Sequence, residues 1–299
     1  MAKIIIMRGL PASGKSTRAQ EILKESGNYV RINKDLLRTM LHFGKWTGVN
    51  EGLTRDAARA LAKMFLGAGT NVIIDDTNLN SGTMHSWQDL AFETNSKVEV
   101  VTMETTLKEC IWRDSKRENG VGRSVIVGMA LQSGLYPRPE NGVVLCDIDG
   151  TLADITHRLH FVHPYIGGPE NPEAAKKDWK SFFGGIPDDR PRLEVIDMLM
   201  KHEEEGRKIF IISARPDTYR EMTEAWLEKA FNGYQPYEAV LMRRASDKRP
   251  DTEVKADMLR QYFPDHSWIR EIIDDRPSVI RMWREKGFYV VDVGNGIEF

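Results

Sequence analysis

The sequence predicts an α/β protein with two domains, each a mainly parallel sheet covered by helices. Short apolar segments alternate with helical stretches along the whole chain, which is typical of parallel strands joined by helical crossovers. A length of 299 residues exceeds the usual size of one domain. A stretch rich in proline and polar residues, 136–142, interrupts the pattern. We therefore expect one domain over residues 1–137 and a second over residues 141–299.

Composition and charge exclude several classes of protein. Hydrophobic residues make up 41% and charged residues 29% of the chain, the balance of a soluble globular protein. A net charge of −2 disfavours a protein that coats long nucleic acid through a general positive field. No apolar run approaches the roughly 20 residues that cross a bilayer, and no leader segment is visible. With only two cysteines, we expect a cytoplasmic protein without disulfides or a membrane partner.

The first half begins with a buried strand, a glycine-containing turn and a helix, and then continues the alternation. Apolar runs of four to six residues give its strands, and longer amphipathic segments give its helices. The expected strands are Lys3–Arg8, Tyr29–Ile32, Asn71–Ile74 and Val98–Met103, and the expected helices are Ser16–Glu25, Leu36–Leu41, Thr54–Leu66 and Leu107–Arg117.

The second half repeats this pattern after the proline-rich stretch. The expected strands are Val143–Cys146, Lys208–Ile212, Ala239–Met242, Arg270–Ile273 and Tyr289–Val293, and the expected helices are Leu193–Glu205, Thr218–Phe231, Glu253–Tyr262 and Val279–Lys286. Between Thr151 and Leu193 lies an insertion long enough for a small cap. Its aromatic residues, Trp179, Phe182 and Phe183, are spaced to pack one helical face.

A phosphate-binding loop follows the first strand. Residues 9–16 have the P-loop spacing and stand between a strand and a helix, as that motif requires. Backbone N–H groups of such a loop surround phosphate oxygens, its lysine reaches the terminal phosphates, and its serine binds Mg²⁺. The expected ATP-binding residues are Gly9, Ser13, Gly14, Lys15, Ser16 and Thr17, with Ser16 also a ligand of Mg²⁺.

Two further strand ends of the first half carry polar residues that suit a phosphate acceptor. Asp35 and Arg38 lie three residues apart on one helix face, so that a base and an anion clamp could share one acceptor. Alternatively, Asp35 only favours the helix N-terminus and Arg38 faces solvent. Asp75, Asp76, Thr77 and Asn78 could hold Mg²⁺ or the acceptor, or could form a turn with a helix cap.

Arg113 and Arg117 lie four residues apart on the last helix predicted in this half. A glycine-bearing segment, 118–122, follows them. This arrangement suits a mobile lid whose arginines neutralise charge on a phosphoryl group during transfer. The alternative is an ordinary exposed helix face.

The run Asp147-Ile148-Asp149-Gly150-Thr151, directly after a predicted strand, resembles the first motif of the haloacid dehalogenase-like phosphatases. This resemblance implies a Rossmannoid sheet in the second half. It also implies that Asp147 attacks phosphorus while Asp149 protonates the leaving group and later activates water. An aspartate nucleophile divides hydrolysis into two steps, and Mg²⁺ offsets the repulsion between its carboxylate and the anionic substrate.

The other residues that this chemistry needs follow at later strand ends, in the order of the family. Ser213 can hydrogen-bond the phosphoryl oxygens, and Lys255 can neutralise the aspartyl phosphate. Asp274 and Asp275 end the last buried strand before the C-terminal helix, where a carboxylate would complete the Mg²⁺ shell together with Asp147 and Asp149.

Together the two sets resemble those of the bacteriophage polynucleotide kinase-phosphatases over essentially the whole chain. The resemblance implies that Asp35 is the general base for a nucleic-acid 5′-hydroxyl, that Arg38 contacts the phosphate of the acceptor, and that Arg117 acts on the donor. It adds further residues that bind the nucleic acid or the 3′ phosphate: Asp76, with Thr77 and Asn78 beside it, Arg158, Ser213, Arg215, Arg243 and Asp251. Two departures stand out: Asp75 replaces an expected uncharged residue, and the cap region, 159–192, is longer.

These motifs lead us to expect an enzyme that phosphorylates 5′-hydroxyl ends of RNA or DNA with ATP and Mg²⁺. The same enzyme would remove 3′-phosphates or 2′,3′-cyclic phosphates. A small-molecule kinase fused to a nucleotide phosphatase is the main alternative, and a nucleic-acid clamp with one inactive site is another. The expected partners are nucleic-acid ends, an RNA ligase acting next, and further copies of the chain. The expected location is the cytoplasm, that of the host cell if a phage encodes the protein.

Overall fold

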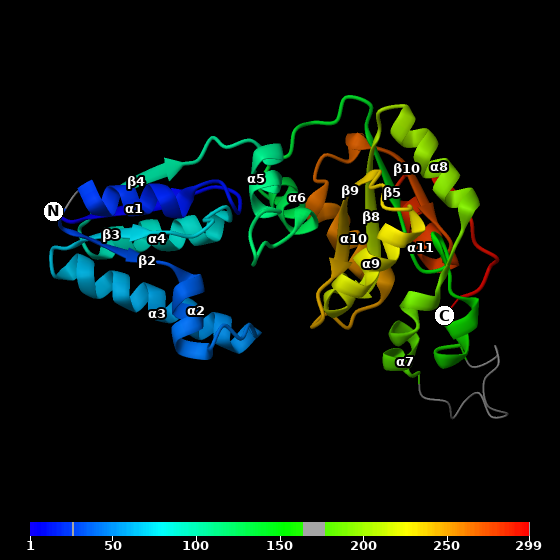
Figure 1. The fold of residues 1–299 in the computed structure, drawn as a ribbon, viewed down its shortest axis with the longest axis horizontal. Helices are drawn as coiled ribbons and strands as arrows, with labels where there is room; N and C mark the ends of the chain where they lie inside the picture. Colours follow the sequence, from blue (N-terminus) through cyan, green and yellow to red (C-terminus); the bar gives the residue numbers. More distant parts are fainter. Residues whose placement is uncertain (26, 164–176, 299) are drawn as a thin grey trace. The chain divides into compact units, whose positions relative to one another are not determined.

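The computed structural model describes residues 1–25, 27–163 and 177–298, which form two compact units (Figure 1). The first unit spans residues 1–135 and the second residues 136–299. The division falls at the start of the proline-rich stretch in which the sequence predicts a linker. Tyr136 is already buried in the second unit, where its ring meets Phe210 edge-on at 5.6 Å. Each unit is an α/β sandwich with an all-parallel sheet, which confirms the predicted fold class.

The sheet of the first unit has the strand order β2-β3-β1-β4. Its strands are β1 (Lys3–Arg8), β2 (Tyr29–Ile32), β3 (Asn71–Ile74) and β4 (Lys97–Thr102). Its helices are α1 (Lys15–Glu25), α2 (Lys34–His42), α3 (Gly48–Gly67), α4 (Ser81–Glu93), α5 (Leu107–Asp114) and α6 (Arg123–Gln132). Alternate residues of β1 serve the two faces: Ile4 and Ile6 pack with α3 and α4, whereas Ile5 and Met7 pack with α1.

The sheet of the second unit has the order β11-β10-β5-β8-β9. Its strands are β5 (Val143–Cys146), β8 (Lys208–Pro216), β9 (Tyr237–Arg243), β10 (Ile269–Asp274) and β11 (Val290–Asp292). Its longer helices are α8 (Leu193–Glu204), α9 (Arg220–Ala230), α10 (Asp251–Tyr262) and α11 (Pro277–Glu285). β5 lies in the middle and is buried along its whole length, so the residues that follow it emerge at the centre of one sheet edge.

The insertion after β5 contains only short elements among the residues that the structure describes. They are β6 (Ala153–Asp154), a 3₁₀ turn over Thr156–Phe161, α7 (Trp179–Gly184), a 3₁₀ turn over Ile186–Asp188 and β7 (Arg190–Pro191). Residues 164–176 of the expected cap lie outside the described part. Phe182 and Phe183 are buried in the core, as their spacing predicts, whereas Trp179 is 42% exposed.

Capping side chains explain where several helices begin. Asn33, Thr47, Asn80 and Thr106 each accept a hydrogen bond from a backbone N–H in the first turn of α2, α3, α4 and α5. α4 and α6 were not predicted individually from the sequence, and α5 ends at Asp114 rather than at Arg117. In the described part of the chain, no helix has both the length and the apolar character needed to cross a bilayer.

Candidate active sites

The P-loop lies at the carboxyl edge of the first sheet, between β1 and α1, and its backbone needs two of its glycines. A side chain at Gly9 would come within 2.7 Å of Ser13 Oγ and 3.0 Å of Met103 Cβ. Gly14 has a φ of +93°, a conformation that residues with a Cβ rarely adopt. The Ser13 carbonyl accepts a hydrogen bond from the Thr105 hydroxyl at 2.8 Å, which ties the loop to the segment after β4.

Lys15 is buried inside this loop, 8% exposed, with its ammonium group turned inward. Its Nζ donates to the Leu10 carbonyl at 2.7 Å and to Ser13 Oγ at 3.4 Å. Burial lowers the pKa of Lys15, and the nearby carboxylate of Asp75 partly offsets this effect. A cation held this way, without a directly bonded carboxylate, is available to an incoming phosphate. Ser16 and Thr17 are exposed at the start of α1.

Two adjacent carboxylates end β3, and they have different partners. Asp75 is paired with Arg31 of β2, whose Nε and Nη2 donate to Asp75 Oδ2 at 2.8 and 2.5 Å. Asp76 accepts a hydrogen bond from the Lys34 backbone at 3.1 Å, and the Lys34 ammonium is 3.8 Å away. Burial raises the pKa of Asp76 to about 6, although Lys34 opposes the shift.

We expect Asp76→Asn to stabilise the first unit above neutral pH. The pKa of Asp76 is about 6 in the folded protein, against an ordinary value of 3.8, so the native state binds the proton more tightly than the unfolded state. Stability therefore falls as pH rises through this range, and the cost above it is about 1–3 kcal/mol. An amide keeps the acceptor for the Lys34 N–H but carries no charge.

Urea unfolding at pH 5 and pH 8 checks this expectation. The gain should appear at pH 8 and shrink at pH 5. The same change at the exposed Asp56 is the matched control. Equal stability of wild type and Asp76→Asn at pH 8 would show that the carboxylate is not costly.

Asp35 and Arg38 lie together on α2, as predicted, with Asp35 exposed to solvent. Arg38 Nη1 donates to Asp35 Oδ1 at 2.6 Å, and the Asp35 side chain is 83% exposed. The sequence analysis missed Glu51, in the first turn of α3, which accepts from Arg38 Nε and Nη2 at 3.0 and 2.7 Å. The carboxylates of Asp35 and Glu51 therefore hold the Arg38 guanidinium in place, and the exposed carboxylate of Asp35 is accessible to an acceptor. No sequence motif links Glu51 to Arg38, because the pairing depends on how α2 and α3 pack.

Thr77 and Asn78 both make contacts inside the first unit. The Thr77 carbonyl accepts from the Gly9 N–H at 3.0 Å. Asn78 is buried, and its amide donates to the Met7 carbonyl at 2.7 Å while its oxygen accepts from Trp87 Nε1 at 3.3 Å. These bonds use Asn78 inside the domain, so the placement favours a structural role over the substrate contact predicted for it.

The two lid arginines do not share a helix, which corrects the sequence analysis. α5 includes Arg113 but ends at Asp114, and Arg117 follows in a turn. Arg113 Nε donates to Glu109 at 2.7 Å, and one of its terminal nitrogens lies 3.7 Å from the position that a Cβ on Gly14 would occupy. The positive charge of Arg117 contributes to lowering the pKa of Lys15. Both guanidinium groups therefore lie near the P-loop, although helix periodicity is not what brings them there.

In the second unit, three carboxylates and one lysine meet at the carboxyl edge of the sheet. Asp147 follows β5, and Asp274 and Asp275 end β10 beside it. Lys255 of α10 joins them: its Nζ is 2.9 Å from Asp147 Oδ1 and 2.8 Å from Asp274 Oδ2. The Thr151 hydroxyl donates to Asp275 Oδ1 at 2.9 Å. All four charged groups are buried.

This cluster has the donor set of a divalent metal site. One oxygen each of Asp147, Asp274 and Asp275 lie within 4.8 Å of one another. Burial, together with the neighbouring Asp274 and Asp275, raises the pKa of Asp147 well above its ordinary value, although Lys255 opposes the shift. Burial and Asp274 raise the pKa of Asp275 to about 7. Crowded carboxylates with a shortage of positive charge fit a hard divalent cation.

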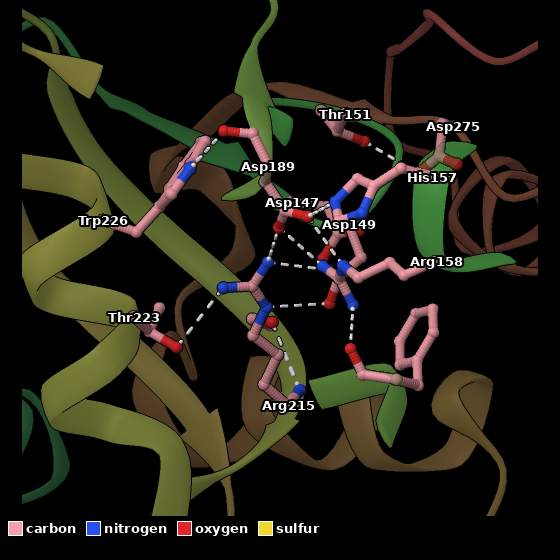
Figure 2. Close-up of polar contacts among 12 residues, drawn as sticks. Asp147, Asp149, Thr151, His157, Arg158, Asp189, Arg215, Thr223, Trp226 and Asp275 are labelled. Atoms are coloured by element: carbon pink, nitrogen blue, oxygen red, sulfur yellow. Dashed lines mark hydrogen bonds and ion pairs between the residues drawn. The ribbon is translucent and has the colours of Figure 1, made fainter. Parts of the chain in front are cut away.

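Asp149 takes part in a separate, arginine-rich network (Figure 2). Arg158 Nη2 donates to Asp149 Oδ1 at 2.5 Å, and Arg215 donates through Nε and Nη2 at 2.9 and 2.7 Å. Burial alone would raise the pKa of Asp149, but Arg215 and Arg158 hold it below its ordinary value. Its carboxylate is thus engaged by arginines and is not one of the three clustered oxygens, so a metal-ligand role for Asp149 stays a prediction.

Asp189 is the residue of this network that sequence reasoning missed. It accepts from Arg158 Nε and Nη2 at 2.6 and 2.7 Å and from Arg215 Nη2 at 3.2 Å, so it holds both arginines (Figure 2). The Trp226 indole donates to its backbone carbonyl at 2.9 Å. Asp189 ends the insertion in a stretch without a motif, and only the tertiary structure brings it to the site.

Several of the remaining predicted residues border a cavity of about 920 Å³. Arg243 and Arg276 both pair with Asp251, whose two oxygens they share. Ser213, at 0% exposure, accepts a hydrogen bond from the Arg215 N–H at 3.2 Å. The cavity is lined by Asp147, Asp149, Lys255, Arg215, Arg243 and Asp251, with Trp179, Tyr219, Lys248 and Arg249 among its other residues. The structure therefore brings the nucleophile motif and most of the later residues to one polar, cationic opening.

Each unit matches a known protein-family description. Residues 141–298 match the family described as the polynucleotide kinase PNKP phosphatase domain, and residues 4–131 match the family described as an AAA domain. The kinase and haloacid dehalogenase-like families imply ATP and a divalent metal ion.

Two relatives and one solved structure illustrate the likeness. A protein of Autographa californica nuclear polyhedrosis virus, provisionally named a bifunctional polynucleotide kinase/RNA ligase, is 25% identical over 95% of this chain and 41% of its own length. The L-seryl-tRNA(Sec) kinase of Methanococcus maripaludis is 27% identical over 42% of this chain and 50% of its own. A chain of the Pnkp1/Rnl/Hen1 RNA repair complex is 24% identical, with a TM-score of 0.41, 99% of this chain and 96% of that chain being covered.

The chain spans only 41% and 50% of the length of these two relatives, so their full activities do not transfer directly. The phosphatase-domain match is of a different kind, because it covers 158 of the 299 residues of this chain. That stretch contains Asp147, Asp149, Lys255, Asp274 and Asp275. The chain therefore belongs to the polynucleotide kinase family defined by the PNKP phosphatase domain.

Proposed function

We propose that this enzyme heals the ends of cleaved nucleic acid. The first unit transfers the γ-phosphate of ATP to a 5′-hydroxyl end of RNA or DNA. The second unit removes a 3′-phosphate or a 2′,3′-cyclic phosphate. The observation that carries the proposal is that one chain holds two candidate phosphate sites, one in each unit. A P-loop lysine with an exposed carboxylate, Asp35, lies in one unit, and Asp147 lies in a carboxylate cluster in the other. Family membership supports a polynucleotide substrate.

In the kinase site, the residues hold the two reactants and move one proton. Asp35 takes the proton of the 5′-hydroxyl while the hydroxyl oxygen bonds to the γ-phosphorus and the bond to the ADP oxygen breaks. Arg38, held by Glu51, contacts the phosphate of the acceptor. Lys15, Arg113 and Arg117 neutralise the charge on the transferring group. Ser16 would bind Mg²⁺.

In the phosphatase site, Asp147 supplies the nucleophile. Its carboxylate oxygen bonds to phosphorus as the bond to the ribose oxygen breaks, which gives an aspartyl phosphate that water then hydrolyses. Lys255 neutralises this intermediate from 2.9 Å. Asp147 and one or both of Asp274 and Asp275 would hold Mg²⁺, which offsets the repulsion between the nucleophile and the phosphate when bound. Ser213 and Arg243 bind phosphoryl oxygens, and Asp251 orients Arg243.

Asp149 acts as an acid in the first step and as a base in the second, so it needs both protonation states. As a carboxylate paired with two arginines it suits the second step, in which it removes a proton from the attacking water. A substrate phosphate that attracts Arg158 and Arg215 would weaken these pairs and let Asp149 take up the proton that it gives to the leaving oxygen. We propose this exchange of arginine partners as the reason that both arginines pair with Asp149, which lines the cavity together with Arg215.

The partners follow from the products. Healed ends carry a 5′-phosphate and a 3′-hydroxyl, which an RNA ligase can join, so we propose that a ligase acts next. Failure of any RNA ligase to join ends treated with this protein would contradict this link. We also propose that the protein forms homo-oligomers, and analytical ultracentrifugation tests this. A single monomeric species at micromolar concentration would refute it.

A single substrate tests both activities. An RNA oligonucleotide with a 5′-hydroxyl and a 2′,3′-cyclic phosphate is incubated with ATP and Mg²⁺, and mass spectrometry reports each end. A mononucleoside and small phosphate esters are run in parallel. Conversion of both RNA ends, with slower turnover of the small molecules, supports end healing. Turnover of the small molecules alone would make the chain a small-molecule kinase-phosphatase.

We expect Asp189→Asn to reduce 3′-phosphate removal by at least about 100-fold and to destabilise the second unit. The change leaves Arg158 and Arg215 buried with one carboxylate instead of two. Breaking a buried ion pair in this way costs about 3–5 kcal/mol. Phosphate release and thermal unfolding measure the two effects.

The neighbouring Asp188 provides a matched control, because it is exposed. Asp188→Asn should behave as wild type in both assays. The kinase activity of Asp189→Asn should also persist and shows that the protein is folded. Full phosphatase activity in Asp189→Asn would mean that Asp149 alone positions the two arginines.

A further inference from the structure

An apolar ledge covers α2 and the turn that leads to α3. Of the twenty large apolar side chains exposed in the described part of the chain, seven fall between Leu36 and Leu53. We define the α2–α3 ledge as Leu36, Met40, Phe43 and Trp46, which are 59%, 68%, 97% and 68% exposed. Leu36, Met40 and Phe43 follow the i, i+4, i+7 spacing of one helix face. Such a concentration of exposed apolar surface is typical of a binding site.

Phe43 has an unfavourable backbone conformation, and packing of its ring within the first unit does not offset that cost. It caps α2 with a φ of +52° and a ψ of +36°, in the left-handed region where glycine is usual. A bulky residue there is rare, and the cost of such strain points to a function. The Phe43 side chain is almost fully exposed, so packing inside the unit does not account for its presence.

The ledge is continuous with the proposed acceptor site. α2 begins at the carboxyl end of β2, on the same sheet edge as the P-loop (Figure 1). Asp35, the proposed base, directly precedes Leu36 in the first turn of this helix. Along the chain, Lys34 and Lys45 stand at the two ends of the ledge; the Lys34 ammonium lies 3.8 Å from Asp76, and Lys45 is exposed.

We propose that the α2–α3 ledge binds the bases of a single-stranded acceptor, beyond the nucleotide whose 5′-hydroxyl faces Asp35. Exposed aromatic rings beside cations are the usual means of holding single strands without regard to sequence, because each base offers a flat face and each linkage a negative charge. Trp46 and Phe43 stack on bases, and Lys34 and Lys45 contact phosphates. This inference deepens the proposed kinase function and rests on it.

The test compares a long acceptor with a minimal one. Wild type, Trp46→Ala and Phe43→Gly are assayed for ATP-dependent phosphorylation of a single-stranded 5′-hydroxyl decamer and of a nucleoside 3′-monophosphate. Each variant should raise the KM for the decamer by roughly 5- to 100-fold. The kcat, and the KM for the nucleoside 3′-monophosphate, should stay unchanged, since that acceptor does not reach the ledge. Phe43→Gly should also raise the melting temperature, because it relieves the left-handed strain.

Phe92→Ala is the matched control. Phe92 is 90% exposed but lies near the end of α4, which leads to the opposite edge of the sheet. It should leave both acceptors unaffected. An unchanged KM for the decamer in Trp46→Ala and Phe43→Gly would overturn the inference, as would an equal loss with both acceptors. The ledge could instead join two copies of the chain. In that case the variants would dissociate in sedimentation, and their KM for the decamer would not rise selectively. This result too would overturn the inference.

Direct binding separates this inference from the proposed function. Fluorescence anisotropy of a labelled decamer measures its Kd for the full chain with no phosphoryl transfer. One outcome is that wild type binds the decamer, the two ledge variants bind it more weakly, and no acceptor is phosphorylated. In that case the ledge proposal stands and the kinase assignment fails. If the acceptors are phosphorylated but binding is the same in all variants, the kinase assignment stands and the ledge fails.

Discussion

Asp147→Asn should abolish removal of the 3′-phosphate, by at least about 1,000-fold, and leave 5′ phosphorylation intact. The amide has nearly the shape of the carboxylate but cannot form the aspartyl phosphate. Lys255 keeps Asp274 as a partner at 2.8 Å, so the surroundings should hold. The release of phosphate from 3′-phosphorylated RNA measures the loss, and label transfer from ATP to the 5′ end serves as the internal control.

The same variant should not lose stability, and this separates loss of chemistry from loss of fold. Asp147, Asp274 and Asp275 crowd their negative charges in a buried site, which is why burial and these neighbours raise the pKa of Asp147. An uncharged residue relieves part of that repulsion, so the melting temperature should stay the same or rise.

The covalent intermediate provides a second check on Asp147. Acid quenching of wild type during turnover, followed by peptide mass spectrometry, should locate a phosphate on Asp147, and the variant should carry none. Phosphatase activity above a few per cent in Asp147→Asn, or an intermediate on another residue, would remove Asp147 from its proposed role.

Lys15→Met should reduce 5′ phosphorylation by about 100-fold or more and leave the phosphatase unaffected. Methionine fills the space of the buried lysine stem but carries no charge and donates no hydrogen bond. Lys15 is 8% exposed, and its ammonium group has only the neutral Leu10 carbonyl and Ser13 hydroxyl as hydrogen-bond partners within the P-loop. A bound phosphate would therefore interact with the positive charge of Lys15.

The control for this variant is Lys24→Met, on the exposed face of the same helix α1. It should phosphorylate 5′ ends at the wild-type rate. Label transfer from ATP at saturating and limiting ATP separates weaker binding from slower transfer. A Lys15→Met enzyme with normal transfer would show that Arg113 and Arg117 supply the charge, and the P-loop would then contribute only its backbone.

Much of the fold was predictable because several of its strands are short, apolar runs bounded by polar residues or turns. The predicted bounds of Lys3–Arg8, Tyr29–Ile32, Asn71–Ile74 and Val143–Cys146 agree with the structure. The end of β8 was less well defined: this interior strand continues to Pro216, four residues beyond the predicted end, through an irregularity in its pairing with β9 between Ser213 and Pro216. The end of α5 was misplaced because Arg117 suits a helix by composition, whereas Asp114 and the following turn end it.

The sequence alone determined the motifs whose residues are neighbours along the chain or follow one strand. The P-loop around Lys15 and the pair Asp147 and Asp149 are of this kind, because parallel strands deliver their carboxyl ends to one edge whatever the details of packing. Family membership of the second unit confirms the phosphatase family that Asp147 and Asp149 indicated.

Only the tertiary structure decided which side chains share partners across distant segments. Asp189 lies 31 residues from Arg158 and 26 from Arg215 and still holds both guanidinium groups. Glu51 reaches Arg38 from another helix, and the buried amide of Asn78 donates to the Met7 carbonyl of β1. A buried charge needs a partner with the right position rather than a place in a motif. That position follows from how helices and turns pack, which a single sequence does not display.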